Sequence, residues 1–347
     1  MVKWRFLFER APATYILATE EVITESVGRG KAPPTVRVNI FDPPAVLVGR
    51  HQCLEAEVNL EEVKKLGFDV NRRCTGGGAI LMYEGAPGWE IWIPEELPGL
   101  PSSIEERYAY LSRVPVRFFE ILGVKARYRP KNDVEVGGRK ISGTGMWSEK
   151  GGLLFCGTIL LDFDVKRMLR VLKLVPEKIS DKLIKSFEER VTTVKRELGR
   201  KPSLDEICLA FKKAVEELFN VELVDGKLND WEMNKLKEVI KKYEDPSWVY
   251  RPGEPKGVSS VFVKKTRAGL FRIYVKKLRN TIESVFITGD FFVYPQRAIY
   301  DLEATLKWTV AKPDTIREKV LRVFKNAEIL GMKTEELADL LVEALCS

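Results

Sequence analysis

The sequence contains a single histidine, His51, and no cysteine pair with CxxC spacing. Histidine-clustered metal centres are therefore excluded. The five cysteines are odd in number, which argues against a disulfide framework. No run of about 18 apolar residues is present, and charged residues interrupt the first twenty positions, where a secretory signal would be apolar. We expect a cytoplasmic protein without a membrane span, whose chemistry uses lysine, arginine, carboxylates, backbone amides or a cysteine.

The composition is that of a globular protein with a sizeable core. The 347 residues are 45% hydrophobic and 31% charged, and the length is typical of two domains. The formal net charge of +7 favours an anionic partner, either nucleic acid or ATP together with an acidic protein. Charge alone does not choose between these partners.

The pattern of local signals predicts an α+β fold with mixed sheets. Strands are expected within residues 31–50 and 68–93, and a helix is expected from Ser103 to Gly123 with an interruption at Pro115. Residues 177–240 read as helical. After a linker, three strands are expected within 258–293 and helices near 301–330 and 334–346. We expect a larger domain over residues 1–250 and a smaller α+β domain over residues 256–347.

The first candidate motif is a run of three glycines, Gly76–Gly78, which follows Arg72 and Arg73. Glycine lets the backbone approach a ligand closely, and successive N–H groups can surround phosphate or carboxylate oxygens. The arginines can clamp phosphate with forked donors. A flexible or bulged turn is an equally good interpretation of these residues.

The second motif, residues 132–143, predicts a β-hairpin whose turn is Gly137–Gly138. In that register Glu135 faces Lys140, and Asp133 faces Ser142 on the same side of the hairpin. A lysine on a rigid strand could neutralise charge between a carboxylate and a phosphate. Asp133 could help to hold Mg²⁺. A plain surface hairpin with ion pairs is the alternative.

A third stretch, residues 151–161, reads as a buried strand that contains Cys156 and then Gly157 and Thr158. Small residues at these positions are typical of close packing between strands. Cys156 fits a small core residue, with a reactive thiol as the alternative interpretation.

Taken in order, RRCTGGGAI, NDVEVGGRKISGTG and GGLLFCGTILLD resemble the three signature stretches of the lipoate–protein ligase family. The resemblance extends over nearly the whole chain. Where many members of that family have His-Asp after the glycines, this chain has Met82 and Tyr83. Where many have a histidine before the Gly-Thr of the third stretch, this chain has Cys156.

The resemblance implies a fold shared with biotin ligases and an enzyme that uses ATP, with Mg²⁺, to activate lipoate or octanoate as an acyl-adenylate. The acyl group would pass to a lysine of a lipoyl domain, in a 2-oxo-acid dehydrogenase acyltransferase or a glycine-cleavage H protein. Lys140 and Asp133 are the expected catalytic residues, and Asp133 would also hold Mg²⁺. Ile80, Leu81, Trp89 and Ile91 are candidates for the acyl-chain tunnel, with ordinary core as the alternative. The residues expected to bind the nucleotide and the acyl-adenylate are Arg73, Gly76, Gly77, Gly78, Ala79, Ile80, Leu81, Asn132, Lys140, Gly157 and Thr158.

Three other functions are open. A transferase on the same fold could take an octanoyl or lipoyl group from a carrier through a thioester on Cys156. A biotin–protein ligase would share the fold, but its GRGR-type signature is not seen. A non-catalytic nucleic-acid-binding module would suit the positive charge, but the sequence lacks the interleaved aromatic and basic motif of RNA-binding domains.

Overall fold

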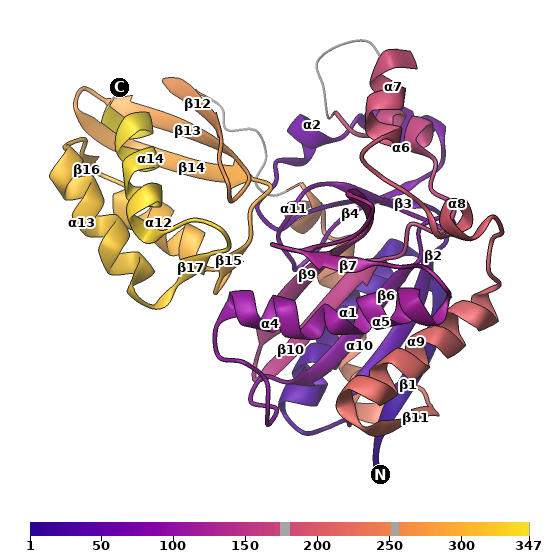
Figure 1. The fold of residues 1–347 in the computed structure, drawn as a ribbon. Coiled ribbons are helices and arrows are strands. Elements are labelled where there is room, and N and C mark those ends of the chain that lie inside the picture. The colour runs from indigo at the N-terminus through magenta and orange to yellow at the C-terminus, as the bar shows by residue number, and fades with distance from the viewer. Residues whose placement is uncertain (174–180, 251–256, 347) are drawn as a thin grey trace. The chain divides into compact units, whose positions relative to one another are not determined.

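The computed structural model describes residues 1–173, 181–250 and 257–346, so the predicted helical residues 177–180 and residues 251–255 of the predicted linker lie outside the described residues. The chain divides into two compact units, which are described separately (Figure 1). The first unit comprises residues Met1–Leu47, Val58–Cys74 and Ile80–Val249. The second comprises Val48–Glu57, Thr75–Ala79 and Tyr250–Ser347.

An eight-stranded mixed sheet is the centre of the first unit, with the strand order β11-β1-β2-β6-β10-β9-β8-β7. β1 is parallel to both of its neighbours, and every pairing from β2 to β7 is antiparallel. The expected α+β fold with mixed sheets is thereby confirmed. The strands are β1 (Val2–Ala11), β2 (Thr35–Phe41), β6 (Gly88–Pro94), β7 (Arg127–Arg129), β8 (Asp133–Val136), β9 (Arg139–Glu149), β10 (Gly152–Thr158) and β11 (Val221–Asp225).

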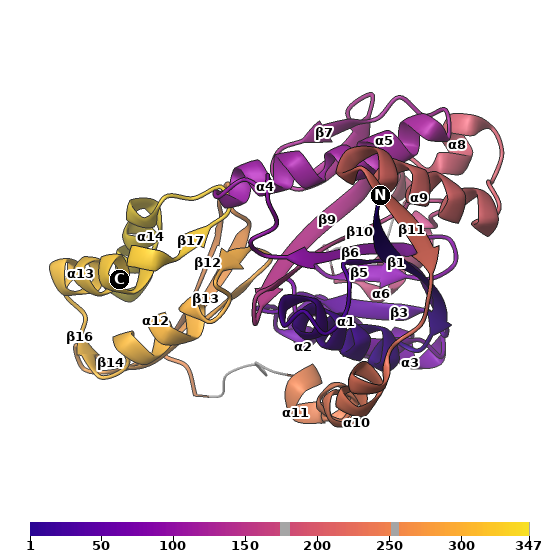
Figure 2. The same ribbon diagram turned by 90° about the horizontal axis from the view of Figure 1, so that it is seen from below.

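A second, three-stranded sheet has the order β4-β3-β5. Its strands are β3 (Ala45–Val48), β4 (Asp69–Arg72) and β5 (Ile80–Met82). Helices surround the two sheets (Figure 2). They are α1 (Ala13–Gly28), α3 (Leu60–Lys65), α4 (Ile104–Leu111), α5 (Arg113–Ile121), α6 (Val165–Val171), α7 (Asp181–Glu188), α8 (Val194–Leu198), α9 (Leu204–Phe219), α10 (Asp230–Glu244) and α11 (Pro246–Val249).

The two faces of the large sheet have separate cores because side chains alternate along each strand. On one face, Trp92 of β6 and Leu154 of β10 pack in a cluster with α1 and α10. On the other face, Trp89 contacts the ring of Phe155 and the ring of Phe211 from α9, each with centroids 5.3 Å apart. Both tryptophans are fully buried, and each contributes about 2–3 kcal/mol to folding by its burial.

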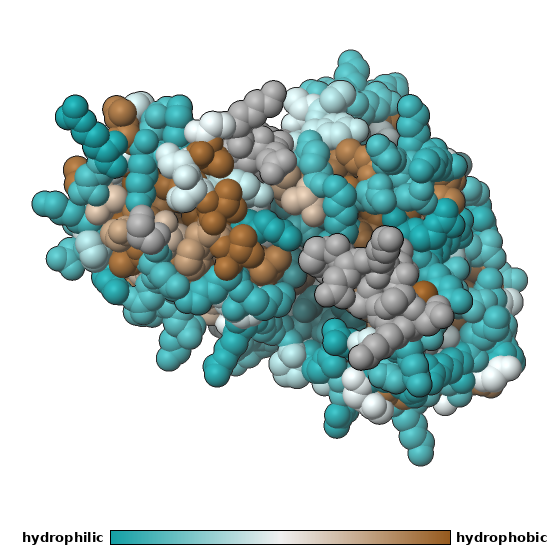
Figure 3. Space-filling view, turned by 90° about the horizontal axis from the view of Figure 1, so that it is seen from above, coloured by the Kyte–Doolittle hydropathy of each residue, from teal (hydrophilic) through white to brown (hydrophobic). Residues whose placement is uncertain are grey.

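The second unit contains a four-stranded antiparallel sheet with the order β12-β13-β14-β16. The three helices α12, α13 and α14 bury an apolar face of this sheet. Figure 3 shows hydrophobic side chains gathered on the part of the surface that this unit forms. The elements are α2 (Leu54–Glu57), β12 (Ser260–Lys265), β13 (Leu270–Leu278), β14 (Thr281–Gly289), β15 (Val293–Tyr294), α12 (Ala298–Leu306), β16 (Thr309–Val310), α13 (Pro313–Val323), η1 (Phe324–Asn326), β17 (Glu328–Ile329) and α14 (Thr334–Cys346).

Two predicted helical segments are interrupted. The segment 177–240 contains β11, where Val221 and Leu223 turn inward while the strand pairs with β1. The segment 301–330 is two helices, because α12 ends at Leu306 and α13 begins at Pro313, a residue that suits the first turn of a new helix.

The expected interruption near Pro115 occurs at Ser112, between α4 and α5, and Pro115 lies in the first turn of α5.

Candidate active site

The hairpin of β8 and β9 forms as predicted around Gly137 and Gly138, which have φ angles of 56° and 81°. Val136 pairs with Arg139, and Glu135 pairs with Lys140. The register then shifts between Val134 and Glu135, so Asp133 lies opposite Gly143 and not opposite Ser142. Ser142 faces Val134 and is fully buried, so its predicted place beside Asp133 was wrong. A β-bulge adds one residue to a strand, and a period-two pattern does not anticipate it.

Lys140 reaches Asp133 in spite of the shifted register. Its Nζ lies 2.7 Å from Asp133 Oδ1. The side chain crosses over Gly143, where a Cβ atom would lie only 2.7 Å from Nζ and 2.8 Å from Cε. Gly143 is therefore required by the path of the lysine side chain.

The backbone of Lys140 is held on both sides. Its N–H donates to the carbonyl of Arg190 at 2.9 Å, and its carbonyl accepts from the N–H of Thr192 at 2.8 Å. The other strand of the hairpin holds it through its pairing with Glu135. A strand fixed on two edges gives the lysine little freedom, which is what a positioned cation requires.

Asp133 has a second cationic partner. Arg129 Nη2 donates to Asp133 Oδ2 at 2.6 Å. Burial alone would raise the pKa of Asp133, but Lys140 and Arg129 together hold it below its ordinary value. Each carboxylate oxygen already faces a cation, so Asp133 does not suit a Mg²⁺ ligand unless Lys140 or Arg129 moves away. In the described residues no group of three or more His, Cys, Asp or Glu side chains is arranged to hold a metal ion.

Three other predicted site residues, Asn132, Gly157 and Thr158, lie beside β9, the strand that carries Lys140. The side chain of Asn132 donates to the carbonyl of Thr144 at 2.8 Å, and Thr144 donates back through its hydroxyl at 3.0 Å. Thr158 Oγ1 accepts from the N–H of Gly143 at 3.2 Å. A Cβ atom on Gly157 would lie 2.8 Å from the Gly143 carbonyl. The structure thus gathers these three predicted site residues around the strand that carries Lys140.

Arg73 and Cys156 belong to a polar cluster on the α1 face of the sheet, in which Arg73 is buried and Cys156 is partly buried. Arg73 donates to the carbonyl of Leu47 at 2.8 Å, and burial lowers the pKa of its guanidinium to about 10. The pKa of the Cys156 thiol lies well above its ordinary value, first because of burial and then because of the carboxyl groups of Glu20 and Glu90. This environment disfavours the thiolate.

The triglycine loop lies in the second unit, against the segment Gly289–Phe292. The N–H of Gly77 donates to the carbonyl of Phe291 at 3.2 Å. A Cβ atom on Gly76 would lie 2.5 Å from that carbonyl, and Gly77 has a φ angle of 89°. His51 stacks on the Phe291 ring with centroids 5.3 Å apart. Gly76 and Gly77 are thus required by contacts within the chain, and the role of the three glycines toward a nucleotide remains a prediction.

The predicted acyl-chain residues are distributed differently from the expectation. Trp89 and Ile91 are fully buried, and Trp89 packs on Phe211 in the α9 core, which favours the ordinary-core interpretation. Leu81 is buried and Ile80 partly buried on β5. Ala79 precedes β5 in the second unit. Because Gly76–Ala79 and Lys140 belong to different units, their meeting in one pocket remains a prediction.

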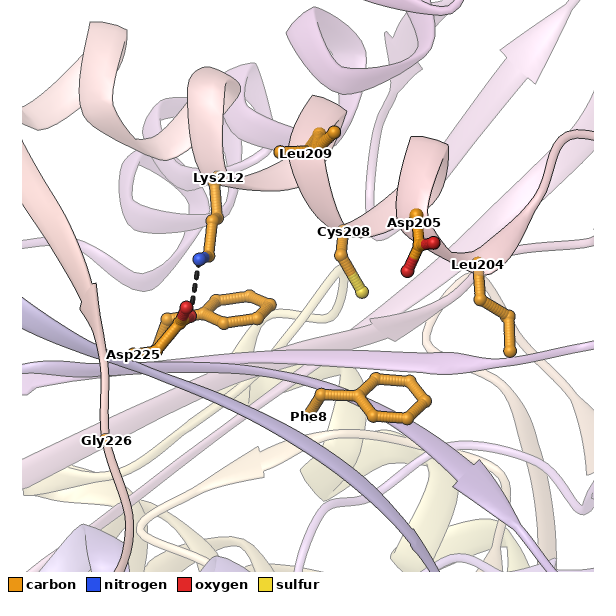
Figure 4. A pocket seen from close by; sticks show the side chains of 9 residues that line it. Phe8, Leu204, Asp205, Cys208, Leu209, Lys212, Asp225 and Gly226 are labelled. Atoms are coloured by element: carbon orange, nitrogen blue, oxygen red, sulfur yellow. Dashed lines mark hydrogen bonds and ion pairs between the residues drawn. The ribbon is translucent and has the colours of Figure 1, made fainter.

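A cavity with a volume of about 710 Å³ lies between β1, β11 and the start of α9 (Figure 4). Lys212 forms an ion pair with Asp225 at its rim, and its ammonium lies 4.4 Å from the centroid of the Phe6 ring. The lining residues are Phe6, Phe8, Leu204, Asp205, Cys208, Leu209, Lys212, Asp225 and Gly226. None of them is a predicted site residue, so the cavity does not belong to the candidate site.

The sequence analysis missed two residues of the site. Arg129 precedes the second motif and contacts Asp133 only because β7 pairs with β8. Gly143 lies within the motif, but its role depends on the bulge that places it beside Lys140. A run of charges on alternating positions, Arg127 and Arg129 followed by Asp133 and Glu135, was the available signal for paired strands.

Among the described residues, no helix combines the length and the apolar character needed to cross a bilayer.

Comparison with known proteins gives a consistent family. A family model described as the lipoyl protein ligase A/B catalytic domain matches residues 12–216. The octanoyltransferase LipM of Brevibacillus brevis is 30% identical over 276 residues, which are 72% of this chain and all of that protein. The corresponding protein of Clostridioides difficile is 27% identical, over 72% of this chain and 98% of its own length.

Solved structures agree with this assignment. A bipartite lipoate–protein ligase from the archaeon Thermoplasma acidophilum, from a study that includes its E2 lipoyl domain, has 27% identity and a TM-score of 0.66, covering 74% of this chain and 100% of its own. A lipoate–protein ligase A bound with ATP has 25% identity and a TM-score of 0.62, covering 72% and 98%. LipL1 of Plasmodium falciparum, in complex with lipoate, has a TM-score of 0.75 over 98% of this chain and 99% of its own, but at 17% identity this likeness shows the fold alone. The chain belongs to the family of the lipoyl protein ligase A/B catalytic domain.

Proposed function

We propose that this protein transfers a lipoyl or octanoyl group to a lysine of a lipoyl domain. The observation that carries this proposal is the Lys140–Asp133 pair, which is fixed on the central sheet within the matched catalytic domain. The relatives support the chemistry, because they include octanoyltransferases and a lipoate ligase studied together with an E2 lipoyl domain. The net charge of +7 suits an acidic carrier domain.

The source of the acyl group distinguishes two candidates. In ligation, the free acid attacks the α-phosphate of ATP, releases pyrophosphate and forms an acyl-adenylate, which the carrier lysine then converts to an amide with release of AMP. In transfer, a thiolate of the protein takes the acyl group from a carrier thioester and releases the carrier thiol. The lysine of the lipoyl domain then attacks this new thioester, forms the amide and releases the protein thiol, without ATP. The names of the curated relatives favour transfer over ligation. The likeness to a lipoate–protein ligase A bound with ATP, at 25% identity, supports ligation.

The environment of the cysteines supports ligation. A transferase of the second kind needs a thiolate, yet burial and two neighbouring carboxyl groups hold the pKa of Cys156 far above neutrality. Burial raises the pKa of Cys53 and of Cys208 to about 11. These environments keep ATP-dependent ligation beside octanoyl transfer, which the curated relatives favour.

In either reaction the chain's own residues have the same tasks. The Lys140 ammonium would neutralise developing charge on the acyl oxygen, and in ligation also on the phosphate. Asp133 would hold that ammonium in place. In ligation Mg²⁺ would balance the charge of the triphosphate. We further propose that residues 1–250 are the catalytic domain, that residues 256–347 are an accessory domain that shields the reacting acyl group from water, and that the protein works in the cytoplasm.

One experiment separates the two donors. The purified protein is incubated with an unmodified lipoyl domain and either ATP, Mg²⁺ and lipoate or octanoate, or an octanoyl acyl-carrier protein alone. Intact-mass spectrometry then reads the acylated domain. Acylation that requires ATP and releases AMP supports ligation, and acylation from the carrier alone supports the transferase. The absence of acylation with every donor would refute the proposal.

A further inference from the structure

Arg129 connects the two acidic residues of the candidate hairpin. Its Nη2 donates to Asp133 Oδ2 at 2.6 Å, and its Nη1 donates to Glu135 Oε2 at 3.0 Å. The forked guanidinium therefore spans two carboxylates on one strand, a geometry that a lysine cannot reproduce. Because Oδ2 of Asp133 is taken by Arg129, Oδ1 is left facing Lys140.

Arg127 lies two residues earlier on the same strand and makes a different set of contacts. Among the described residues its ionic partner is Glu135 alone, with Nη2 2.7 Å from Oε1. Its side chain is 77% exposed, whereas that of Arg129 is 40% exposed. The two arginines are thus chemically identical neighbours, of which one contacts the carboxylate that holds Lys140.

The charges of this cluster do not cancel. Three cations, on Arg127, Arg129 and Lys140, face two carboxylates, on Asp133 and Glu135. Without Arg129 the charge of Asp133 would be balanced by Lys140 alone, and the lysine would have little attraction left for an anionic ligand. With Arg129 present, Asp133 is shared, and one positive charge remains on the cluster. A net positive cluster on a rigid strand suits a carboxylate or a phosphate.

We propose that Arg129 is a positioning residue, which orients Asp133 and shares its negative charge so that the Lys140 ammonium stays both fixed and available to the anionic substrate. This inference rests on the proposed function, because it requires Lys140 to act on the acyl donor. It assigns to β7 a role that the three signature stretches do not include.

The test compares Arg129→Gln, Arg129→Lys and the matched control Arg127→Gln in the full chain. We expect Arg129→Gln to lower kcat/KM for acyl transfer by about tenfold, since small misplacements of a reacting group reduce rates by that order or more. Arg129→Lys, which keeps the charge but not the fork, should recover part of the loss. Arg127→Gln removes one positive charge from the same cluster but no contact with Asp133, so it should lower kcat/KM clearly less than Arg129→Gln does.

A second measurement requires no activity. The ¹⁵Nζ chemical shift of Lys140 is followed by NMR of ¹⁵N-labelled lysine at fixed pH, and we expect it to change in Arg129→Gln, because Lys140 then contacts an Asp133 carboxylate that no second cation holds. The same kcat/KM and the same Lys140 ¹⁵Nζ chemical shift for Arg129→Gln and Arg127→Gln would overturn the inference while leaving the proposed function intact. Loss of acyl transfer with every donor in the unsubstituted protein would overturn the proposed function itself.

Discussion

Substitution of Gly143 by alanine should separate activity from stability. The new Cβ atom would lie 2.7 Å from Lys140 Nζ, 2.8 Å from Cε and 3.8 Å from Asp133 Oδ1. The first two distances are impossible contacts, but both involve the far end of a flexible side chain that is 37% exposed. The lysine should therefore swing into solvent and abandon Asp133, while the backbone stays in place.

Gly143→Ala should change the stability of the protein much less than its rate of acyl transfer. A partly exposed ion pair contributes at most about 1 kcal/mol to stability, and replacing glycine by alanine offsets about 0.4–1 kcal/mol by restricting the unfolded chain. We expect the Tm to change by less than about 4 °C. Displacement of the reacting ammonium by more than an ångström should lower the rate of acyl transfer by about 100-fold.

The assay is acyl transfer to the lipoyl domain, measured beside calorimetric unfolding of the same protein sample. Ser142→Ala is the matched control, because Ser142 is the neighbouring residue on the strand, faces Val134, and has a hydroxyl without a hydrogen-bond partner among the described residues. The control should retain both activity and Tm. A Gly143→Ala protein with normal activity would refute the role given to the lysine path, and a large loss of Tm would refute the claim that only a side chain moves.

Three other substitutions test separate parts of the account. Cys156→Ser should leave ATP-dependent acyl transfer unchanged, whereas loss of all transfer at a normal Tm would favour the thioester route. Asp133→Asn should lower the free energy of unfolding at neutral pH, because the folded-state pKa of Asp133 is depressed. The difference in the free energy of unfolding from the unsubstituted protein is present above the ordinary pKa of about 4 and disappears as the pH falls through the lower folded value. A difference that persists at lower pH would contradict this reasoning. Glu232→Gln should lower the free energy of unfolding, measured in urea, by about 3–5 kcal/mol, because the buried guanidinium of Arg5, which lies 2.6 Å from Glu232, loses its counter-charge. A decrease of less than about 1 kcal/mol would show that water reaches this pair.

The sequence predicted those features of the fold that depend on neighbouring residues. The Gly137–Gly138 turn fixes the hairpin locally, and Ser103, the expected start of a helix, is the N-cap of α4. The pairing of Lys140 with Glu135 followed from the turn alone. Lys140 and Asp133 were expected on the same face of the hairpin, but their direct contact was not predicted, because the bulge that shifts the register was not anticipated.

Features that depend on distant residues could not be read in the same way. β11 resembles a helical segment, and only its parallel pairing with β1 makes it a strand. The contact of Gly77 with Phe291 joins segments that lie far apart in the chain. The burial of Cys156 beside Glu20 and Glu90 brings together three separate elements, so the state of its thiol could not be derived from the sequence.

The central claim is that the Lys140 ammonium, fixed by Asp133, acts on the acyl group. The most direct measurement is the rate at which a lipoyl domain gains the acyl group when ATP, Mg²⁺, lipoate, octanoate and an octanoyl carrier are all supplied, so that the result does not depend on the donor. The comparison is between Lys140→Ala and Lys150→Ala, because Lys150 follows the same strand and pairs with Glu25 instead. We expect the rate of acyl transfer to fall by at least about 100-fold in Lys140→Ala and to stay unchanged in Lys150→Ala. Equal rates for the two variants would contradict a role of Lys140 in the reaction.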